Sequence, residues 1–121
     1  MEIFGPGAQL LSAGFVGREF PVATFANDGT TLLEPETDPR IVRKVRMIAT
    51  ISGSGAATFV GLAFSQRMRS ADEVQYRALP SVETAIYVPG RAYLAVGTDG
   101  TGASIAIYVE RWLTPHVVQQ G

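Results

Sequence analysis

The sequence predicts an all-β protein, a single-domain antiparallel β-sandwich or jelly roll, and three observations lead to that prediction. Turn-forming clusters of Gly, Pro, Asn and Asp recur at short intervals, for example at Asn27-Asp28-Gly29 and Pro89-Gly90. The segments between these clusters have strand length, about 5 to 12 residues, and are rich in Val, Ile, Thr, Phe and Tyr. The chain has 121 residues, the size of one domain, and shows no repeat or linker. We therefore expect one domain over residues 1–121.

The clearest strand covers residues 41–51, where apolar and polar residues alternate and Arg43 is the only charged residue in the apolar row. After the turn Gly53-Ser54-Gly55, residues 56–65 are apolar in both rows, which is typical of a central strand covered on both faces. The turn between the two segments predicts that they pair as one long antiparallel hairpin.

A second hairpin is predicted near the C-terminus. Residues 91–97 and 103–113 flank a turn whose glycines permit the positive φ angles of a chain reversal. Residues 82–88 form a further strand, which we expect to pair close to this hairpin. The strands predicted in the first third of the chain rest on weaker patterns and cover residues 8–16, 20–25 and 30–33.

Two segments are expected to be less regular. Ser70-Ala71-Asp72-Glu73 fits a capping box, so we expect a short helical turn within residues 70–78. Extended chain should follow that turn, because Val74, Tyr76 and Ala78 alternate with polar residues. Residues 1–17 are expected to form an extended N-terminal arm that reaches onto a neighbouring molecule.

The composition argues against catalysis. The chain has no cysteine and one histidine, which excludes thiolate chemistry and cysteine-ligated zinc sites. His116 follows Thr114-Pro115 near the chain end, where we expect no nucleophile or orienting carboxylate to be held against it. Glu34, Glu36 and Asp38 occupy a proline-bounded loop, which we interpret as a solvated surface segment rather than a glycosidase or calcium site. We predict no enzyme activity, no catalytic residue, no metal and no cofactor.

The charges indicate neither nucleic acid nor a membrane as partner. Ten basic and eleven acidic residues leave a net charge of -1, so no overall field attracts polyanions. Residues 40–46 hold four of the basic residues but no aromatic residue for base stacking, so we expect salt bridges to the acidic loop upstream. The glycines of residues 97–102 lead into a strand rather than a phosphate-binding helix. We expect neither a membrane-spanning segment nor a signal peptide.

Each of the last three predicted strands carries an aliphatic row on one face and a row of small and aromatic residues on the opposite face. Tyr and Trp among small neighbours suit a protein interface. The same rows fit a second core layer or cross-strand pairing on an outer face equally well. Charged residues make up only 17% of the chain, which favours surface hidden in an assembly. The candidate interface residues are Ala85, Tyr87, Tyr93, Ala95, Ala106, Tyr108 and Trp112.

The chain resembles the small β-sandwich virion proteins of tailed bacteriophages, of the head decoration or cement type. The resemblance rests on Gly-, Ala- and Thr-rich strands, the absence of cysteine and the terminal segment Tyr93–Tyr108. It implies a virion protein, made in the host cytoplasm, that forms a homo-oligomer, a trimer being favoured, and clamps a capsid lattice.

Two function classes follow from the residues themselves. The first is a structural protein that self-associates and docks on a larger assembly, which accounts for the missing catalytic groups and the low charge. The alternative is a ligand-binding β-sandwich module, for instance for carbohydrate. In that case Trp112 or a tyrosine would stack on a sugar ring, with Glu110 beside it.

Overall fold

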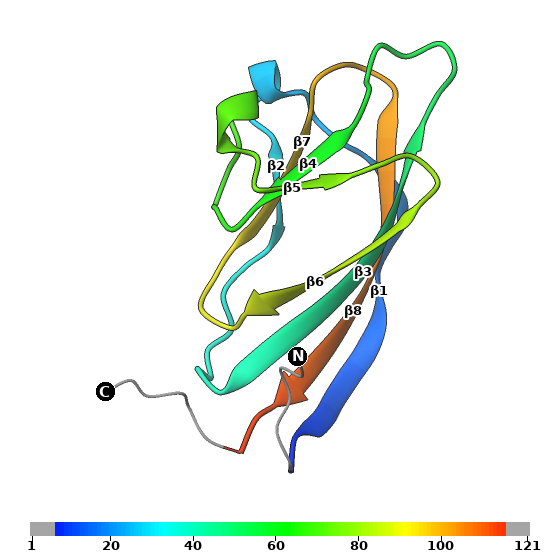
Figure 1. Cartoon of the computed structure of the whole chain (residues 1–121). Helices are drawn as coiled ribbons and strands as arrows, with labels where there is room; N and C mark the ends of the chain where they lie inside the picture. Colours follow the sequence, from blue (N-terminus) through cyan, green and yellow to red (C-terminus); the bar gives the residue numbers. More distant parts are fainter. Residues whose placement is uncertain (1–6, 116–121) are drawn as a thin grey trace.

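The computed structural model describes residues 7–115 and is a sandwich of two antiparallel four-stranded sheets (Figure 1). The all-β sandwich predicted from the sequence is confirmed. The first sheet has the order β1-β8-β3-β6 and contains β1 (Gln9–Pro21), β8 (Ala103–Leu113), β3 (Ile41–Ile51) and β6 (Glu83–Pro89). The second sheet has the order β2-β7-β4-β5 and contains β2 (Thr30–Leu33), β7 (Leu94–Thr98), β4 (Val60–Ala63) and β5 (Tyr76–Ala78).

The core lies between the sheets, because β3 and β8 each alternate buried residues with more exposed ones. Side chains from both sheets form one apolar cluster. Full burial of one such side chain contributes about 1.5–3 kcal/mol, so this cluster is the main source of stability. Its members with no more than 1% exposure include Val45, Met47, Ile105 and Ile107 of the first sheet and Val60, Leu62, Leu94 and Val96 of the second.

Both predicted hairpins are wrong, because in each case the two strands belong to different sheets. β3 pairs with β6 and β8, whereas β4 pairs with β5 and β7. β7 lies between β2 and β4 and therefore does not pair with β8. β6, which we expected beside the C-terminal hairpin, pairs with β3 at the edge of the first sheet. The predicted central position of β4 is confirmed, since all four of its residues are buried.

The two crossings between the sheets pack against each other at one end of the sandwich. The amide of Ala57 donates a hydrogen bond to the carbonyl of Thr101 at 3.0 Å. A Cβ atom on Gly100 would lie 2.5 Å from the carbonyl carbon of Ala56, so glycine is required for this close approach. A crossing loop and a hairpin turn use the same glycine chemistry, which explains why the sequence pattern predicted hairpins.

Part of the expected N-terminal arm belongs to the sandwich. Residues 9–17 lie in β1, which pairs with β8 of the same chain. Backbone pairing with β8 satisfies amide and carbonyl groups that a free arm would leave to solvent. The register between β1 and β8 shifts at three points, which explains the weak alternation of this segment in the sequence. Residues 1–6 lie outside the described residues.

The helical turn predicted within residues 70–78 is confirmed as the 3-10 helix η2 (Ala71–Glu73), followed by β5. Ser70 makes no capping hydrogen bond with its side chain. The carboxylate of Glu73 instead accepts a hydrogen bond from the amide of Arg69 at 2.7 Å. Neither half of the predicted capping box is therefore formed, because Glu73 accepts from the amide of the residue before Ser70.

The outer face of the second sheet, which we call the covered face, is buried by the chain itself. Val74 follows η2, and Phe25 belongs to a second 3-10 helix, η1 (Phe25–Asn27). A Cβ atom on Gly97 would lie 2.9 Å from the Phe25 ring, so the small residues of this face make room for the cover. The second apolar cluster formed here consists of Ala63, Met68 and Ala95, with Phe25 and Val74 packed against it.

Candidate interaction surface

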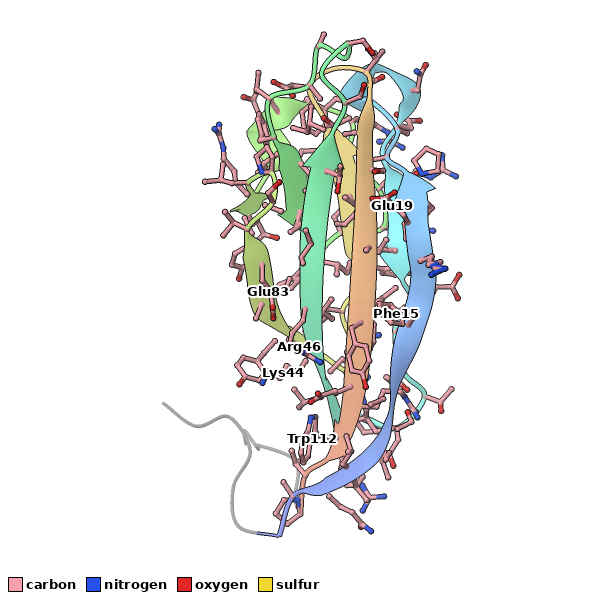
Figure 2. All side chains as sticks on the ribbon, turned by 90° about the vertical axis from the view of Figure 1, so that its right-hand side faces the viewer. Phe15, Glu19, Lys44, Arg46, Glu83 and Trp112 are labelled. Carbon is pink, nitrogen blue, oxygen red and sulfur yellow. The ribbon has the colours of Figure 1, made fainter. Side chains whose placement is uncertain are left out.

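The outer face of the first sheet is the candidate functional surface. Alternate residues of β3 and β8 are buried in the core, so the residues between them point outward. Figure 2 shows this side of the sheet, with Phe15, Arg46 and Trp112 among the labelled residues. We call it the aromatic face, and its outward side chains include Phe15 from β1, Ala106, Tyr108, Glu110 and Trp112 from β8, Lys44, Arg46 and Ile48 from β3, and Glu83, Ala85 and Tyr87 from β6.

Tyr108 is at the centre of this face. In the strand register it lies opposite Phe15 on one side and opposite Arg46 on the other. The rings of Phe15 and Tyr108 meet edge to face, with their centroids 5.4 Å apart and an interplanar angle of 87°. The guanidinium carbon of Arg46 lies 4.6 Å from the centroid of the Tyr108 ring. Such contacts contribute about 0.5–1.5 kcal/mol each, so the three side chains form an ordered row across the sheet.

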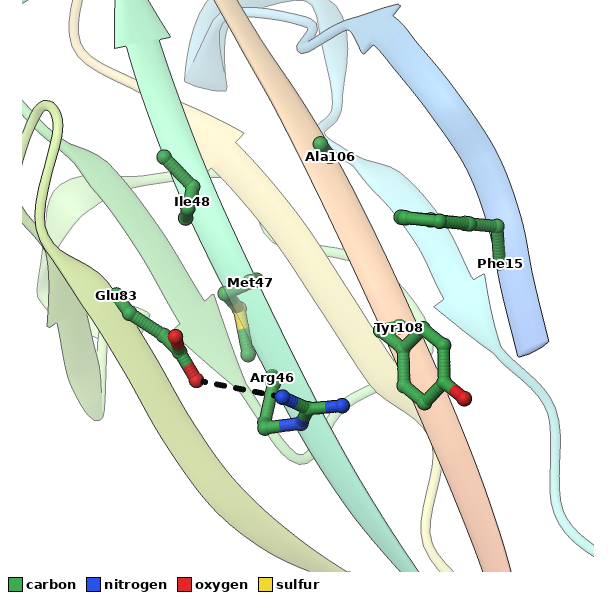
Figure 3. A pocket seen from close by; sticks show the side chains of 7 residues that line it. All are labelled: Phe15, Arg46, Met47, Ile48, Glu83, Ala106 and Tyr108. Atoms are coloured by element: carbon green, nitrogen blue, oxygen red, sulfur yellow. Dashed lines mark ion pairs between the residues drawn. The ribbon is translucent and has the colours of Figure 1, made fainter. Parts of the chain in front are cut away.

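A hollow of about 250 Å³ opens on the aromatic face. The small side chain of Ala106 lies between Phe15 and Ile48 and leaves this space unfilled (Figure 3). An apolar cavity of about 150 Å³ is large enough to bind benzene, so a hollow of this size has room for an aromatic side chain. The residues that line the hollow are Phe15, Arg46, Met47, Ile48, Glu83, Ala106 and Tyr108.

Charged side chains border the hollow and balance one another. Arg46 lies 3.9 Å from a carboxylate oxygen of Glu83 and 3.8 Å from one of Glu110. Lys44 shares the outward row of β3 with Arg46 and lies opposite Glu110 in the register. Exposed ion pairs contribute about 0–1 kcal/mol, so these groups add little to folding. Their two positive and two negative charges cancel, which leaves this part of the face without net charge.

Of the seven predicted interface residues, the structure brings five together on the aromatic face: Ala85, Tyr87, Ala106, Tyr108 and Trp112. The prediction that Ala95 shares this face is wrong, because β7 belongs to the other sheet and Ala95 is fully buried in the second apolar cluster. Tyr93 directly precedes β7 and belongs to no strand of the first sheet. The core-layer interpretation therefore holds for Ala95, and the aromatic face is the candidate interface.

Of the residues that line the hollow, sequence reasoning named Ala106 and Tyr108 as interface residues but missed the two exposed apolar ones, Phe15 and Ile48. Phe15 is 69% exposed and Ile48 is 43% exposed. Ile48 falls in the polar row of residues 41–51, and its apolar character in that row was the available signal. Phe15 lies in β1, whose register shifts hide the alternation that would have assigned it to a face.

The basic run at residues 40–46 forms salt bridges with the acidic loop, as predicted. Arg40 pairs with Asp38 at 2.9 Å, and Arg43 lies 3.9 Å from Glu36. The hydrogen bonds from Arg40 lower the pKa of Asp38. The interpretation of the loop as a solvated segment is wrong for Glu36, whose side chain is only 15% exposed and lies 2.7 Å from the guanidinium of Arg111.

Arg43 is the most unusual charged residue, because it is 1% exposed and points into the core side of the first sheet. Its guanidinium donates hydrogen bonds to the carbonyl oxygens of Glu34 at 2.5 Å, Pro89 at 2.7 Å and Ala92 at 2.7 Å. These bonds tie two loops to β3 at the end of the sheet. The hydrogen bond from Arg111 lowers the pKa of Glu36, although burial opposes the shift.

The described residues contain neither a metal-ligand group nor a helix that could span a membrane. Across residues 7–115, no three acidic or histidine side chains are grouped so that they could hold a metal ion. Within the same residues, no helix has the length and apolar character needed to span a bilayer. His116, the one histidine, lies outside the described residues.

No known family model matches this chain, and no curated protein matches it. Its fold is similar to that of a solved chain from Bacillus endospore appendages, which are described as a novel family of disulfide-linked pili. The TM-score is 0.55 and the sequence identity is 11%, over 94% of this chain and 97% of that chain. At this identity the likeness shows a shared fold.

Proposed function

We propose that this protein is a non-enzymatic structural subunit that self-associates and docks into a larger assembly through the aromatic face. The unequal cover of the two sheets carries the proposal. The chain buries the covered face under its own Phe25 and Val74, whereas Phe15 and Ile48 on the aromatic face are 69% and 43% exposed. Exposed apolar side chains that gather on one face and are rimmed by charges are typical of a protein–protein contact.

The fold likeness supports the proposal, since a chain of similar fold belongs to appendages that assemble as pili. Those pili are disulfide-linked, whereas this chain has no cysteine. Contacts between copies of this chain would therefore be non-covalent. Such contacts depend on apolar area and on shape, and the aromatic face offers both.

The finer part of the proposal concerns the assembly itself. We propose a protein lattice such as a phage capsid, with a trimer as the favoured oligomer and the virion as the location. This part rests on the sequence resemblance to phage decoration proteins. A surface appendage is the other kind of assembly that the fold likeness supports.

A carbohydrate-binding module is the competing function, and it depends on Trp112 and Glu110. The structure places these residues together, but the indole N–H of Trp112 donates a hydrogen bond to the Glu110 carboxylate at 3.3 Å. Glu110 also approaches Arg46 at 3.8 Å. A carboxylate engaged in this way is less available to sugar hydroxyls, which favours the structural proposal.

Light scattering on a size-exclusion column, over a dilution series, tests the proposed function. We expect a mass above that of one chain that increases with concentration. A single-chain mass at every concentration would contradict self-association. A glycan screen on the same sample would then decide for the alternative, if it shows binding that Trp112→Ala abolishes.

A further inference from the structure

We infer that the partner on the aromatic face is a second copy of this chain, and that each copy inserts its Phe15 side chain into the hollow of the other. This inference deepens the proposed function and rests on it. It names the occupant of the face and the side chain that would fill the hollow beside Ala106.

The first argument is that a projection and a hollow lie side by side on one face. Phe15 is the most exposed of the large apolar side chains in the described residues, at 69%. Its ring forms one wall of the hollow, which extends across Ala106 towards Ile48 (Figure 3). A two-fold interface uses the same patch on both copies, so it requires the projecting group and its receptor on a single surface. The aromatic face meets that requirement.

The second argument is charge. Lys44 and Arg46 are balanced on this face by Glu83 and Glu110, and Figure 2 labels Lys44, Arg46 and Glu83 on the same side of the sheet as Phe15. A strongly acidic or basic partner would gain no net attraction from such a surface. A second copy brings the same balanced set, so positive side chains of one copy can approach negative side chains of the other.

The third argument is area. β1 has 13 residues, β3 and β8 have 11 each, and β6 has 7. At about 3.4 Å per residue and about 4.8 Å between strands, the face measures on the order of 700 Å². Standard interfaces bury about 800 Å² per partner, so two copies that meet over the whole face would form a contact near the lower end of the standard class. A second copy is therefore large enough to cover the face, and a dilution series measures how tightly it binds.

Two variants of opposite character test the inference by sedimentation or light scattering on the full chain. Phe15→Asp removes the projecting ring, and Ala106→Phe fills the hollow while adding apolar surface. We expect each to weaken self-association by roughly tenfold or more, as loss of an interface anchor does. Leu79→Asp is the matched control, because Leu79 is 53% exposed and does not line the hollow. Far-UV circular dichroism and the thermal midpoint verify that all variants fold.

The outcomes separate the inference from the proposed function. Wild-type association that survives both Phe15→Asp and Ala106→Phe would overturn the inference and leave the proposed function in place, with another surface as the contact. Association weakened by Phe15→Asp but strengthened by Ala106→Phe would also overturn it, since that result indicates apolar contact without insertion. A wild-type chain that stays monomeric at millimolar concentration would overturn both.

Discussion

The covered face of the second sheet and the aromatic face of the first sheet carry similar residues, small side chains next to aromatic ones, but they differ in what lies on them. On the covered face, Ala95 is fully buried beneath side chains from other parts of the same chain. On the aromatic face, Phe15 is 69% exposed beside the half-exposed Ala106. The same residue types thus serve as an internal layer in one sheet and as an outer surface in the other.

The difference shows that a row of apolar residues on a strand does not by itself indicate whether the same chain buries that row. The second sheet has short strands, and the loops around η1 and η2 fold back over it. The first sheet has three strands of 11 to 13 residues, and Phe15 and Ile48 on its outer face are 69% and 43% exposed. The same kind of substitution on each face therefore measures how differently the two faces are buried.

The largest effect is expected when one charge is placed on each face. Ala95→Asp buries a carboxylate in the second apolar cluster and should lower the free energy of unfolding by about 3 kcal/mol or more. Ala106→Asp leaves its carboxylate accessible to water and should change that free energy by less than about 1 kcal/mol. Urea unfolding at low protein concentration measures both. Equal losses would mean that the two faces are covered to the same degree.

The two sides of the first sheet can be compared on a single strand. Arg43→Met removes the guanidinium donor from the carbonyl oxygens of Glu34, Pro89 and Ala92, of which Pro89 keeps the amide of Ala92, and should cost about 3 kcal/mol. Arg46→Met removes long, partly exposed ion pairs and the contact with the Tyr108 ring, and should cost about 1 kcal/mol. Thermal or urea unfolding provides the measurement. A larger loss for Arg46→Met would show that the aromatic face stabilises the monomer.

Glycine-to-alanine substitutions add one methyl group and test how tightly Val74 packs on the covered face. A Cβ atom on Gly61 would lie 2.5 Å from Cγ2 of Val74, so Gly61→Ala should cost about 1–3 kcal/mol. Gly14 lies in β1 and has nothing within 4 Å of the same position. Gly14→Ala should be neutral or stabilise by up to about 1 kcal/mol. A neutral Gly61→Ala would indicate that Val74 moves easily and that the cover is loosely packed.

The smallest effect expected is on the pH dependence of the first sheet. The pKa of Glu36 is lower in the folded chain than in the unfolded chain, so its stabilising effect is complete above the unfolded value of about 4.3. That contribution is lost as the pH falls through the lower, folded pKa. The advantage of the wild type over Glu36→Gln at neutral pH should therefore shrink in acid.

Urea unfolding between neutral pH and pH 3 or so follows this change. Glu34→Gln, an exposed position in the same loop, controls for the loss of one negative charge. Hydrogen exchange would show amides of β3 and β8 losing protection before those of β4 and β7, because Glu36 lies against Arg43 and Arg111 of the first sheet. A constant difference at all pH values would contradict the role assigned to this pair.

The sequence by itself determined the class of fold, the composition of the two faces of β3 and β8 and the pairing of nearby charges. These are local properties, because side chains alternate with a period of two residues and Asp38 is two positions from Arg40. Alternation therefore identified the outward row of β8, with Ala106, Tyr108 and Trp112, before any strand partner was known.

Only the tertiary structure decided which strands pair, which outer face is covered and where Arg43 finds its partners. The glycines of the loops before β4 and after β7 are equally compatible with a hairpin and with a crossing between sheets, and contacts remote in sequence decide between them. Arg43 donates to the carbonyl of Ala92, 49 positions away, and Phe15 contacts Tyr108 of the adjacent strand β8. Such contacts depend on the path of the whole chain, since burial is decided by the sum of long-range packing and not by any local pattern.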